Sequence, residues 1–234
     1  MRLYLDCVGL LVYSPAATLR PDNRVMYWGY NPGQDPFIKD ETHWTIREAI
    51  EKFPKQMSLI NEQSWPKPRK EKNTVTGEEK YSGRYPKGEA PYQRGVRSLL
   101  QFIGHTDALV ANFLFFQTRR QHHLHPTREE VDCCWQIHRF LLEKTKARVL
   151  ITTRGVISVL RRFELMNLET PIERYPSGYS NWNCELYKKL DGFPTIIAAP
   201  HMSYWGRCSE GNNIVTKYGP ALRWIKERVD RLTH

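Results

Sequence analysis

Four short and nearly continuous apolar runs divide the chain. They cover residues 25–28, 108–116, 148–152 and 194–199. A strand that is covered on both faces shows this pattern, because neither face alternates with polar side chains. We therefore predict a buried strand at each of the four positions.

Helical periodicity separates these runs. The clearest helix spans residues 127–146, where Thr127 and Glu130 form the signature of a capping box. One polar residue, His138, falls on its apolar stripe, and we interpret it as a hydrogen-bonded, half-buried histidine. Further helical patterns cover residues 41–53, 93–103 (ended by Gly104), 155–163 and 220–232. The alternation of strands and helices predicts an α/β fold: a three-layer α/β/α sandwich with a central, mostly parallel four-stranded sheet.

Two segments depart from this alternation. Residues 186–190 and 194–199 flank an Asp-Gly pair, which predicts a hairpin leading into the last strand. The segment at about 61–97 is basic and rich in proline, which indicates a long insertion or lid. We expect residues 1–234 to form a single domain that carries this insertion.

Composition narrows the class of partner. The 234 residues are 40% hydrophobic, enough for a large core, and carry a formal net charge of +10. This charge favours a polyanionic partner, above all nucleic acid, and the alternative is a basic surface without such a partner. Five cysteines without a C-x-x-C pair, and the lack of a signal peptide or a membrane-spanning apolar run, favour a cytoplasmic protein with reduced thiols. We expect a monomer that does not bind membranes.

Polar residues mark the ends of three predicted strands. The first strand runs into the sequence Gly-Tyr-Asn-Pro-Gly, which places Asn31 at its carboxyl end. Asn112 lies within the second apolar run, and His201 follows the last one. Ligands of open α/β sheets bind at the carboxyl ends of the strands, so these residues are candidates for one site. Each is a weak signal by itself, because Asn and His at strand ends are also common turn and capping residues.

In this order, the motifs resemble those of the uracil-DNA glycosylase superfamily. Residues 29–33 are similar to its first motif, in the form of the mismatch-specific and single-strand-selective branches. Asn112 falls where the family has a pocket asparagine on its second strand. Residues 200–206, Pro-His-Met-Ser-Tyr-Trp-Gly, are similar to a diverged second motif, which is usually His-Pro-Ser-Pro. The resemblance covers about residues 24–224, apart from the insertion.

The resemblance implies a monofunctional DNA glycosylase that leaves an abasic site and needs no cofactor or metal. Asn31 would position the attacking water, and His201 or nearby backbone N–H groups would stabilise charge on O2 of the departing pyrimidine. Asn112 would hydrogen-bond the extruded base, and Phe37 or Tyr30 would stack on it. The implied substrate-binding residues are Gly29, Tyr30, Gly33, Phe37 and Asn112.

The resemblance also implies contacts with double- or single-stranded DNA. Trp205 falls at the family's wedge position, which fills the gap left by an extruded base, and its alternative role is ordinary loop packing. Arg119 and Arg120 lie in a basic run after the second strand, where we expect phosphate contacts. The histidines of this run could also bind a metal, but their spacing fits no standard zinc pattern. The implied DNA-binding residues are Ser203, Tyr204, Trp205, Arg207, Arg119 and Arg120.

Several alternatives stay open at this point. Residues 33–37 also resemble the motif of the uracil-specific branch, in which Asp35 would activate the water instead of Asn31. In the frame with Asn31, Gly33 replaces the aromatic residue that excludes C5 substituents, so the pocket would admit uracil or a C5-modified pyrimidine such as glucosylated hydroxymethylcytosine. The role would then be DNA repair or antiviral defence. A non-catalytic DNA-binding module on the same fold and a nucleic-acid methyltransferase are the competing functions.

Overall fold

The computed structural model describes residues 5–7, 9–30, 44–55, 58, 69–72, 79–82, 90–116, 125–206 and 214–234 of the chain. For residues 69–72 and 79–82 it describes the backbone alone.

The four predicted apolar runs contain neighbouring parallel strands, although the strand predicted over residues 108–116 ends at Asn112. In sheet order they are β4 (Leu109–Asn112), β1 (Val25–Gly29), β5 (Val149–Thr153) and β8 (Thr195–Ala199). Strand β1 pairs in parallel with both β4 and β5, and β5 pairs in parallel with β8. Every residue of these strands is buried, which explains why their sequences lack polar alternation.

The sheet is larger than predicted. Strands β7 (Asn183–Tyr187) and β6 (Glu173–Pro176) continue it beyond β8 in antiparallel orientation, so the sheet is mixed and has six strands instead of four. The apolar pattern missed β6 because this edge strand alternates between partly and fully exposed residues. The hairpin predicted to lead into the last strand is confirmed, although its first strand begins at Asn183 instead of residue 186.

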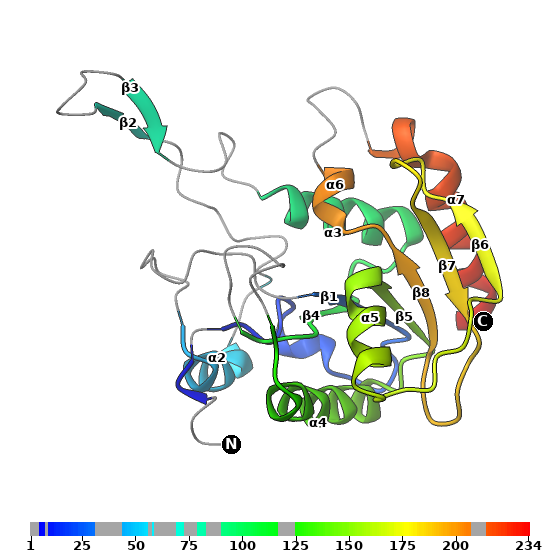
Figure 1. The fold of residues 1–234 in the computed structure, drawn as a ribbon, viewed down its shortest axis with the longest axis horizontal. Coiled ribbons are helices and arrows are strands. Elements are labelled where there is room, and N and C mark those ends of the chain that lie inside the picture. Colours follow the sequence, from blue (N-terminus) through cyan, green and yellow to red (C-terminus); the bar gives the residue numbers. More distant parts are fainter. Residues whose placement is uncertain are drawn as a thin grey trace.

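Helices cover both faces of the sheet, as predicted (Figure 1). The strand residues Met26 and Trp28 pack in one core cluster with α4 and α5, whereas Val25 and Tyr27 pack in the other with α3, α6 and α7. The helices are α2 (Ile46–Lys52), α3 (Pro91–Ile103), α4 (Arg128–Thr145), α5 (Arg154–Arg162), α6 (Met202–Gly206) and α7 (Ile214–Thr233), with short 3₁₀ turns at Ala16–Thr18 and Phe53–Lys55.

Local signals fix two helix ends where the sequence placed them, whereas the described part of the helix predicted over residues 41–53 begins only at Ile46 and the helix predicted over residues 220–232 already begins at Ile214. The Thr127 hydroxyl accepts a hydrogen bond from the Glu130 N–H, and the Glu130 carboxylate accepts one from the Thr127 N–H, which completes the predicted capping box of α4. Helix α3 ends at Gly104, whose left-handed φ of 80° suits glycine.

An N-terminal arm covers the outer edge of β4. Its residues pair in antiparallel orientation with the strand, with bridges from Gly9 to Phe116 and from Val12 to Ala111. The Tyr13 N–H donates to the Val110 carbonyl at 2.8 Å. The arm therefore satisfies backbone groups that an open sheet edge would expose.

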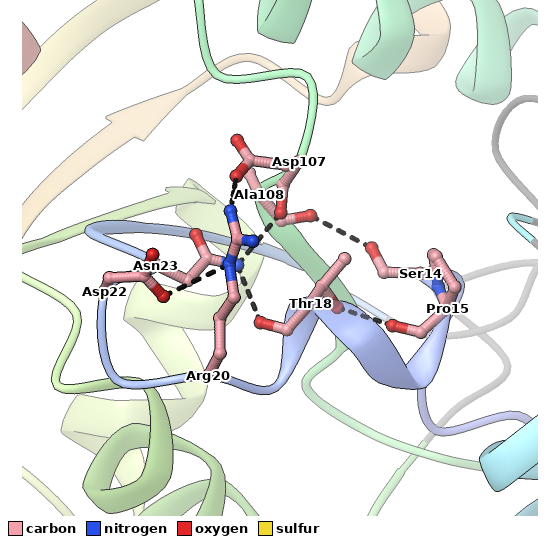
Figure 2. A network of polar contacts seen from close by, with 8 residues as sticks. All are labelled: Ser14, Pro15, Thr18, Arg20, Asp22, Asn23, Asp107 and Ala108. Atoms are coloured by element: carbon pink, nitrogen blue, oxygen red, sulfur yellow. Dashed lines mark hydrogen bonds and ion pairs between the residues drawn. The ribbon is translucent and has the colours of Figure 1, made fainter.

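Polar contacts anchor the continuation of this arm at the amino ends of β1 and β4 (Figure 2). The Ser14 hydroxyl donates to the Ala108 carbonyl at 3.0 Å, and the Asn23 amide donates to the carbonyls of Thr18 and Asp107. Arg20 forms ion pairs with Asp107 and with Asp22. This network lies at the opposite end of the parallel strands from Gly29 and Asn112, so its role is structural.

The predicted insertion contains regular structure. Strands β2 (Arg69–Lys72) and β3 (Glu79–Ser82) pair as a separate two-stranded antiparallel sheet. Helix α3 already begins at Pro91, so the boundary placed at residue 97 was too far along the chain. Within the described ranges, no helix is long and apolar enough to cross a membrane. The described cysteines, namely Cys7, Cys133, Cys134 and Cys184, are free thiols.

Candidate functional site at the carboxyl ends of the parallel strands

Three predicted site residues meet where the parallel strands end. Gly29 is the last residue of β1 and pairs with Asn112, the last residue of β4. His201 follows β8 by two residues, and its ring lies 5.4 Å from the ring of Tyr92 on α3. Tyr92 therefore links the β8 side of the site to the β1 side.

Gly29 marks a close approach between backbone and side chains. A Cβ atom at this position would overlap the Tyr92 hydroxyl and would lie 2.8 Å from Oδ1 of Asn112. These contacts bring the Asn112 amide and the Tyr92 hydroxyl together over the end of β1. Glycine is required here for a steric reason, because a side chain would collide with these two groups.

The Asn112 side chain is 1% exposed and belongs to the described core. Its Nδ2 group donates to the Leu10 carbonyl at 3.4 Å, and its backbone N–H donates to the Leu11 carbonyl at 3.0 Å. Its amide also neighbours the Tyr13 hydroxyl, where burial raises the pKa of Tyr13 to about 12 and the Asn112 hydrogen bond partly offsets that rise. The N-terminal arm therefore fixes the orientation of Asn112.

A cluster of three tyrosines surrounds these groups. The Tyr92 ring lies 5.9 Å from that of Tyr13 and 6.3 Å from that of Tyr27. Burial raises the pKa of Tyr27 and Tyr92 well above its ordinary value, so both phenols stay neutral. The two phenol groups also interact with each other, which lowers the pKa of Tyr27 and raises that of Tyr92, although neither buried hydroxyl meets strict hydrogen-bonding geometry with any described residue. An unpaired buried hydroxyl is costly, and it is typical of a place where a polar ligand group or water binds.

Ser203 holds the His201 ring. The Ser203 backbone N–H donates to Nδ1 of His201 at 3.3 Å, and the Ser203 hydroxyl lies 2.7 Å from the same atom. Because Nδ1 accepts a hydrogen bond from a backbone N–H, the neutral ring carries its own proton on Nε2. His201 can therefore donate a hydrogen bond through Nε2. Ser203 was predicted to contact DNA, and the contact that the structure gives it is this one.

The segment that carries His201 is packed tightly on α3. A Cβ atom at Gly206 would overlap the Pro91 carbonyl, and one at Gly95 would overlap the Met202 carbonyl. The Arg94 guanidinium donates to the Gly206 carbonyl at 2.9 Å. The close contact between α6 and α3 therefore holds this segment in a fixed position.

The predicted wedge residue needs a correction. Trp205 is 0% exposed and stacks on Tyr218 of α7, with 5.3 Å between ring centroids. It therefore anchors α6 in the core and does not project from the surface in this structure. Its neighbour Tyr204 is partly exposed and stacks on Tyr179 at 4.7 Å. Sequence counting could not separate these neighbours, because the rotation of a five-residue helix depends on its packing.

Other predicted residues lie elsewhere. Tyr30 is 8% exposed and packs in the core cluster with α4 and α5, away from the cluster that contains Tyr92. His138 is fully buried instead of half-buried, and its Nε2 atom lies 2.9 Å from the Phe113 carbonyl. Its Nδ1 atom has no hydrogen-bond partner among the described residues.

Comparison of the sequence with protein-family models and with curated proteins finds no match. The function must therefore be argued from the chemistry of the site.

Several residues that the sequence singled out lie outside the described ranges. They are Asn31, Gly33, Asp35, Phe37, Arg119, Arg120, His122, His123 and Arg207. Within the ranges that are described, no group of three His, Cys, Asp or Glu side chains is arranged to hold a metal ion.

The sequence did not indicate that Tyr27 and Tyr92 belong to the site, or that Gly95 allows a close contact between helices beside it. Tyr92 stands near the start of an amphipathic helix, and Tyr27 is one member of an apolar run, so neither has a distinctive local signal. Gly95 lies inside a helix, where glycine costs about 1 kcal/mol relative to alanine. This unfavourable residue was the feature of the sequence that could have indicated a close contact between α3 and another element.

Proposed function

We propose that the protein is a monofunctional DNA glycosylase of the uracil-DNA glycosylase type. It hydrolyses the N-glycosidic bond of a flipped uracil or C5-modified pyrimidine, such as a hypermodified cytosine, and releases the free base. The observation that carries the proposal is the meeting of Gly29, Asn112, Tyr92 and His201 at the carboxyl ends of β1, β4 and β8. The resemblance of the two motifs that contain Gly29 and His201 supports it. In this proposal the four parallel strands form the glycosylase core, and β6 and β7 extend it.

The site has groups suited to the edge of a pyrimidine. The Asn112 amide offers an acceptor in Oδ1 and, beyond the Nδ2 hydrogen that it donates to the Leu10 carbonyl, a second donor hydrogen, and the edge of a uracil or a cytosine requires both kinds of group. The hydroxyls of Tyr27 and Tyr92, which meet strict hydrogen-bonding geometry with no described residue, would gain partners from the base or from water that enters with it. All these groups are neutral, so the pocket selects by hydrogen bonding and shape instead of charge.

The reaction places negative charge on the departing base. A water oxygen bonds to the sugar anomeric carbon, and the bond from that carbon to N1 of the pyrimidine breaks. The bonding electron pair leaves with the base and is shared with its O2 atom, and the water gives up a proton that the released base finally takes. The Nε2–H of His201 donates to O2 while the charge develops. Asn31 follows Gly29 by two residues and orients the water, since an amide is too weak a base to deprotonate it.

The net charge of +10 supports DNA as the partner. The enzyme would act as a monomer on cytoplasmic DNA, either in base-excision repair or in defence against foreign DNA with modified bases. It would need no cofactor, because neither the water nor the leaving group requires one in this mechanism.

Base release from defined DNA tests the proposal. DNAs that carry uracil, thymine opposite guanine, 5-hydroxymethylcytosine or its glucosylated form are incubated with the protein, and free bases are measured by mass spectrometry. Asn31→Ala should reduce release by about 10²-fold or more while leaving DNA affinity near that of the wild type. Asn167→Ala, which removes an exposed asparagine after α5, is the matched control and should be fully active.

The outcomes separate the candidate functions. Release of one base that is lost in Asn31→Ala supports the proposal and names the substrate. Full activity in Asn31→Ala would move the water-positioning role to Asp35 or another group. Salt-sensitive DNA binding without release of any base would favour the non-catalytic DNA-binding module.

A further inference from the structure

An aromatic cluster lies on the surface beside His201. Tyr179 and Trp182 come from the turn between β6 and β7, and Tyr204 comes from α6. The Tyr179 and Tyr204 rings stack at 4.7 Å and 18°, and the Trp182 ring stands edge-on to both, at 6.0 Å and 5.6 Å. All three side chains are partly exposed. We call these three residues the aromatic platform.

The turn holds the platform in a fixed shape. The Ser177 N–H donates to the Trp182 carbonyl at 3.0 Å, and the Trp182 N–H donates to the Tyr179 carbonyl at 3.1 Å. Gly178 and Ser180 both adopt positive φ angles, of 75° and 50°. A left-handed serine is strained, so its surroundings must determine the shape of the turn. The aromatic rings are therefore presented in a defined arrangement before any ligand binds.

The platform is adjacent to the candidate site. The Tyr204 ring lies 6.1 Å from the His201 ring, and the turn and α6 lie at the same end of the molecule (Figure 1). Gly178 of the turn faces the Tyr218 ring and the Lys217 backbone carbonyl near the start of α7. A chain that leaves the site along this side would therefore meet the aromatic faces.

Anchoring of α6 does not depend on the whole platform. Trp205 and Met202 are fully buried and attach α6 to the core, and Tyr179 packs against that same core cluster. Trp182 and Tyr204 are partly exposed. Three partly exposed aromatic rings in contact are unusual for a surface without a partner.

We propose that the aromatic platform binds an unpaired nucleobase of the DNA strand by stacking. The bound base belongs to a nucleotide that neighbours the one in the site, and this second statement rests on the proposed function. Stacking on Tyr and Trp tolerates any sequence, because every base has an aromatic face. The net charge of +10 favours a polyanionic strand over an uncharged ligand such as a sugar.

Binding of single-stranded DNA tests the platform without any chemistry. The dissociation constant of a fluorescent thymidine oligonucleotide is measured by anisotropy over a range of salt concentrations. Trp182→Ala and Tyr179→Ala should each weaken binding by about tenfold, whereas Trp182→Phe should retain most of the affinity. The slope of log K against log salt should not change, since no cation is removed. Phe140→Ala, which removes a 49% exposed aromatic from α4 on the other face, is the matched control.

Four results would overturn the proposal. The first is wild-type affinity in Trp182→Ala, and the second is an equal loss in Phe140→Ala. The third is that the wild-type protein binds an oligonucleotide of abasic residues as tightly as the thymidine oligonucleotide. The fourth is displacement of the thymidine oligonucleotide by free glucose, which would indicate a sugar-binding surface. The comparison with the abasic oligonucleotide uses the wild-type protein, so it keeps the test valid if either alanine variant fails to fold.

The same variants separate this inference from the proposed function. Weaker binding in Trp182→Ala, together with no base release by the wild type, would support the platform and remove the glycosylase. Unchanged binding in Trp182→Ala, together with base release by the wild type, would support the glycosylase and remove the platform.

Discussion

Replacement of Gly29 by alanine tests the close packing of the site. The new Cβ would overlap the Tyr92 hydroxyl and would lie 2.8 Å from Asn112 Oδ1 and 3.1 Å from Cζ of Tyr92. All these separations are shorter than the ~3.5 Å at which non-bonded heavy atoms attract best. The obstructing atoms are side-chain atoms, so Tyr92 and Asn112 would move while the sheet stays intact.

Both stability and activity should respond. Overpacking of this size costs about 1–3 kcal/mol of unfolding free energy, which urea denaturation can measure. A displacement of about 1 Å at the reacting groups costs about 10²-fold in rate, so single-turnover base release should fall by that order. Gly219→Ala is the matched control, because its Cβ would meet only the flexible end of Arg223 at 3.3 Å. That variant should be neutral or stabilised by up to ~1 kcal/mol, since alanine favours the helix.

A double variant tests the stated cause. Tyr92→Phe removes the oxygen that the new Cβ would overlap, so Gly29→Ala with Tyr92→Phe should recover part of the lost stability, by at least ~0.5 kcal/mol of coupling. Tyr92→Phe alone should cost at most about 1 kcal/mol of stability, because the Tyr92 hydroxyl interacts with Tyr27 but meets strict hydrogen-bonding geometry with no described residue. Wild-type stability and activity in Gly29→Ala, or no coupling with Tyr92→Phe, would refute the close approach of these groups.

Two further predictions concern buried side chains. Burial lowers the pKa of His138 from 6.5 to about 4, so the unfolded chain binds more protons than the folded one between these values. The folded state should lose on the order of 3 kcal/mol as pH falls from about 6.5 to 4, and urea titrations of the wild type and His138→Gln should differ in this pH slope. Equal slopes would show that His138 is not the titrating group. Trp205→Ala should destabilise the protein by about 3–5 kcal/mol, because the ring is fully buried against Tyr218. A variant of unchanged melting temperature with impaired DNA binding would instead restore the wedge role.

The sequence predicted the inner part of the sheet better than its edge. Strands β1, β4, β5 and β8 are covered on both faces, so both faces need apolar side chains. The resulting apolar runs can be recognised in the sequence. Strand β6 is an edge strand with charged residues, and its pairing with β7 depends on contacts that periodicity does not report. The size of the sheet therefore could not be predicted from apolar runs.

The site was predictable only where a residue lies at a strand end. Gly29, Asn112 and His201 have positions that the chain order of strands determines, and the structure brings them together. Tyr92 reaches the same place from α3, and its position depends on how closely α3 approaches α6 through Gly95. Contacts of this kind arise from tertiary packing, for which one sequence offers no local pattern.

The N-terminal arm has a consequence for how the molecule opens. Residues 9–13 add a backbone ladder to β4 and bring Tyr13 against Asn112, so detachment of the arm would also release the amide that faces the site. Such partial opening needs less free energy than global unfolding, and it would leave the inner strands folded. The amide protons of Leu10, Tyr13 and Asn112 should then exchange with solvent as one unit. The local stability of this short arm would thus limit how long the site stays assembled, independently of the stability of the core.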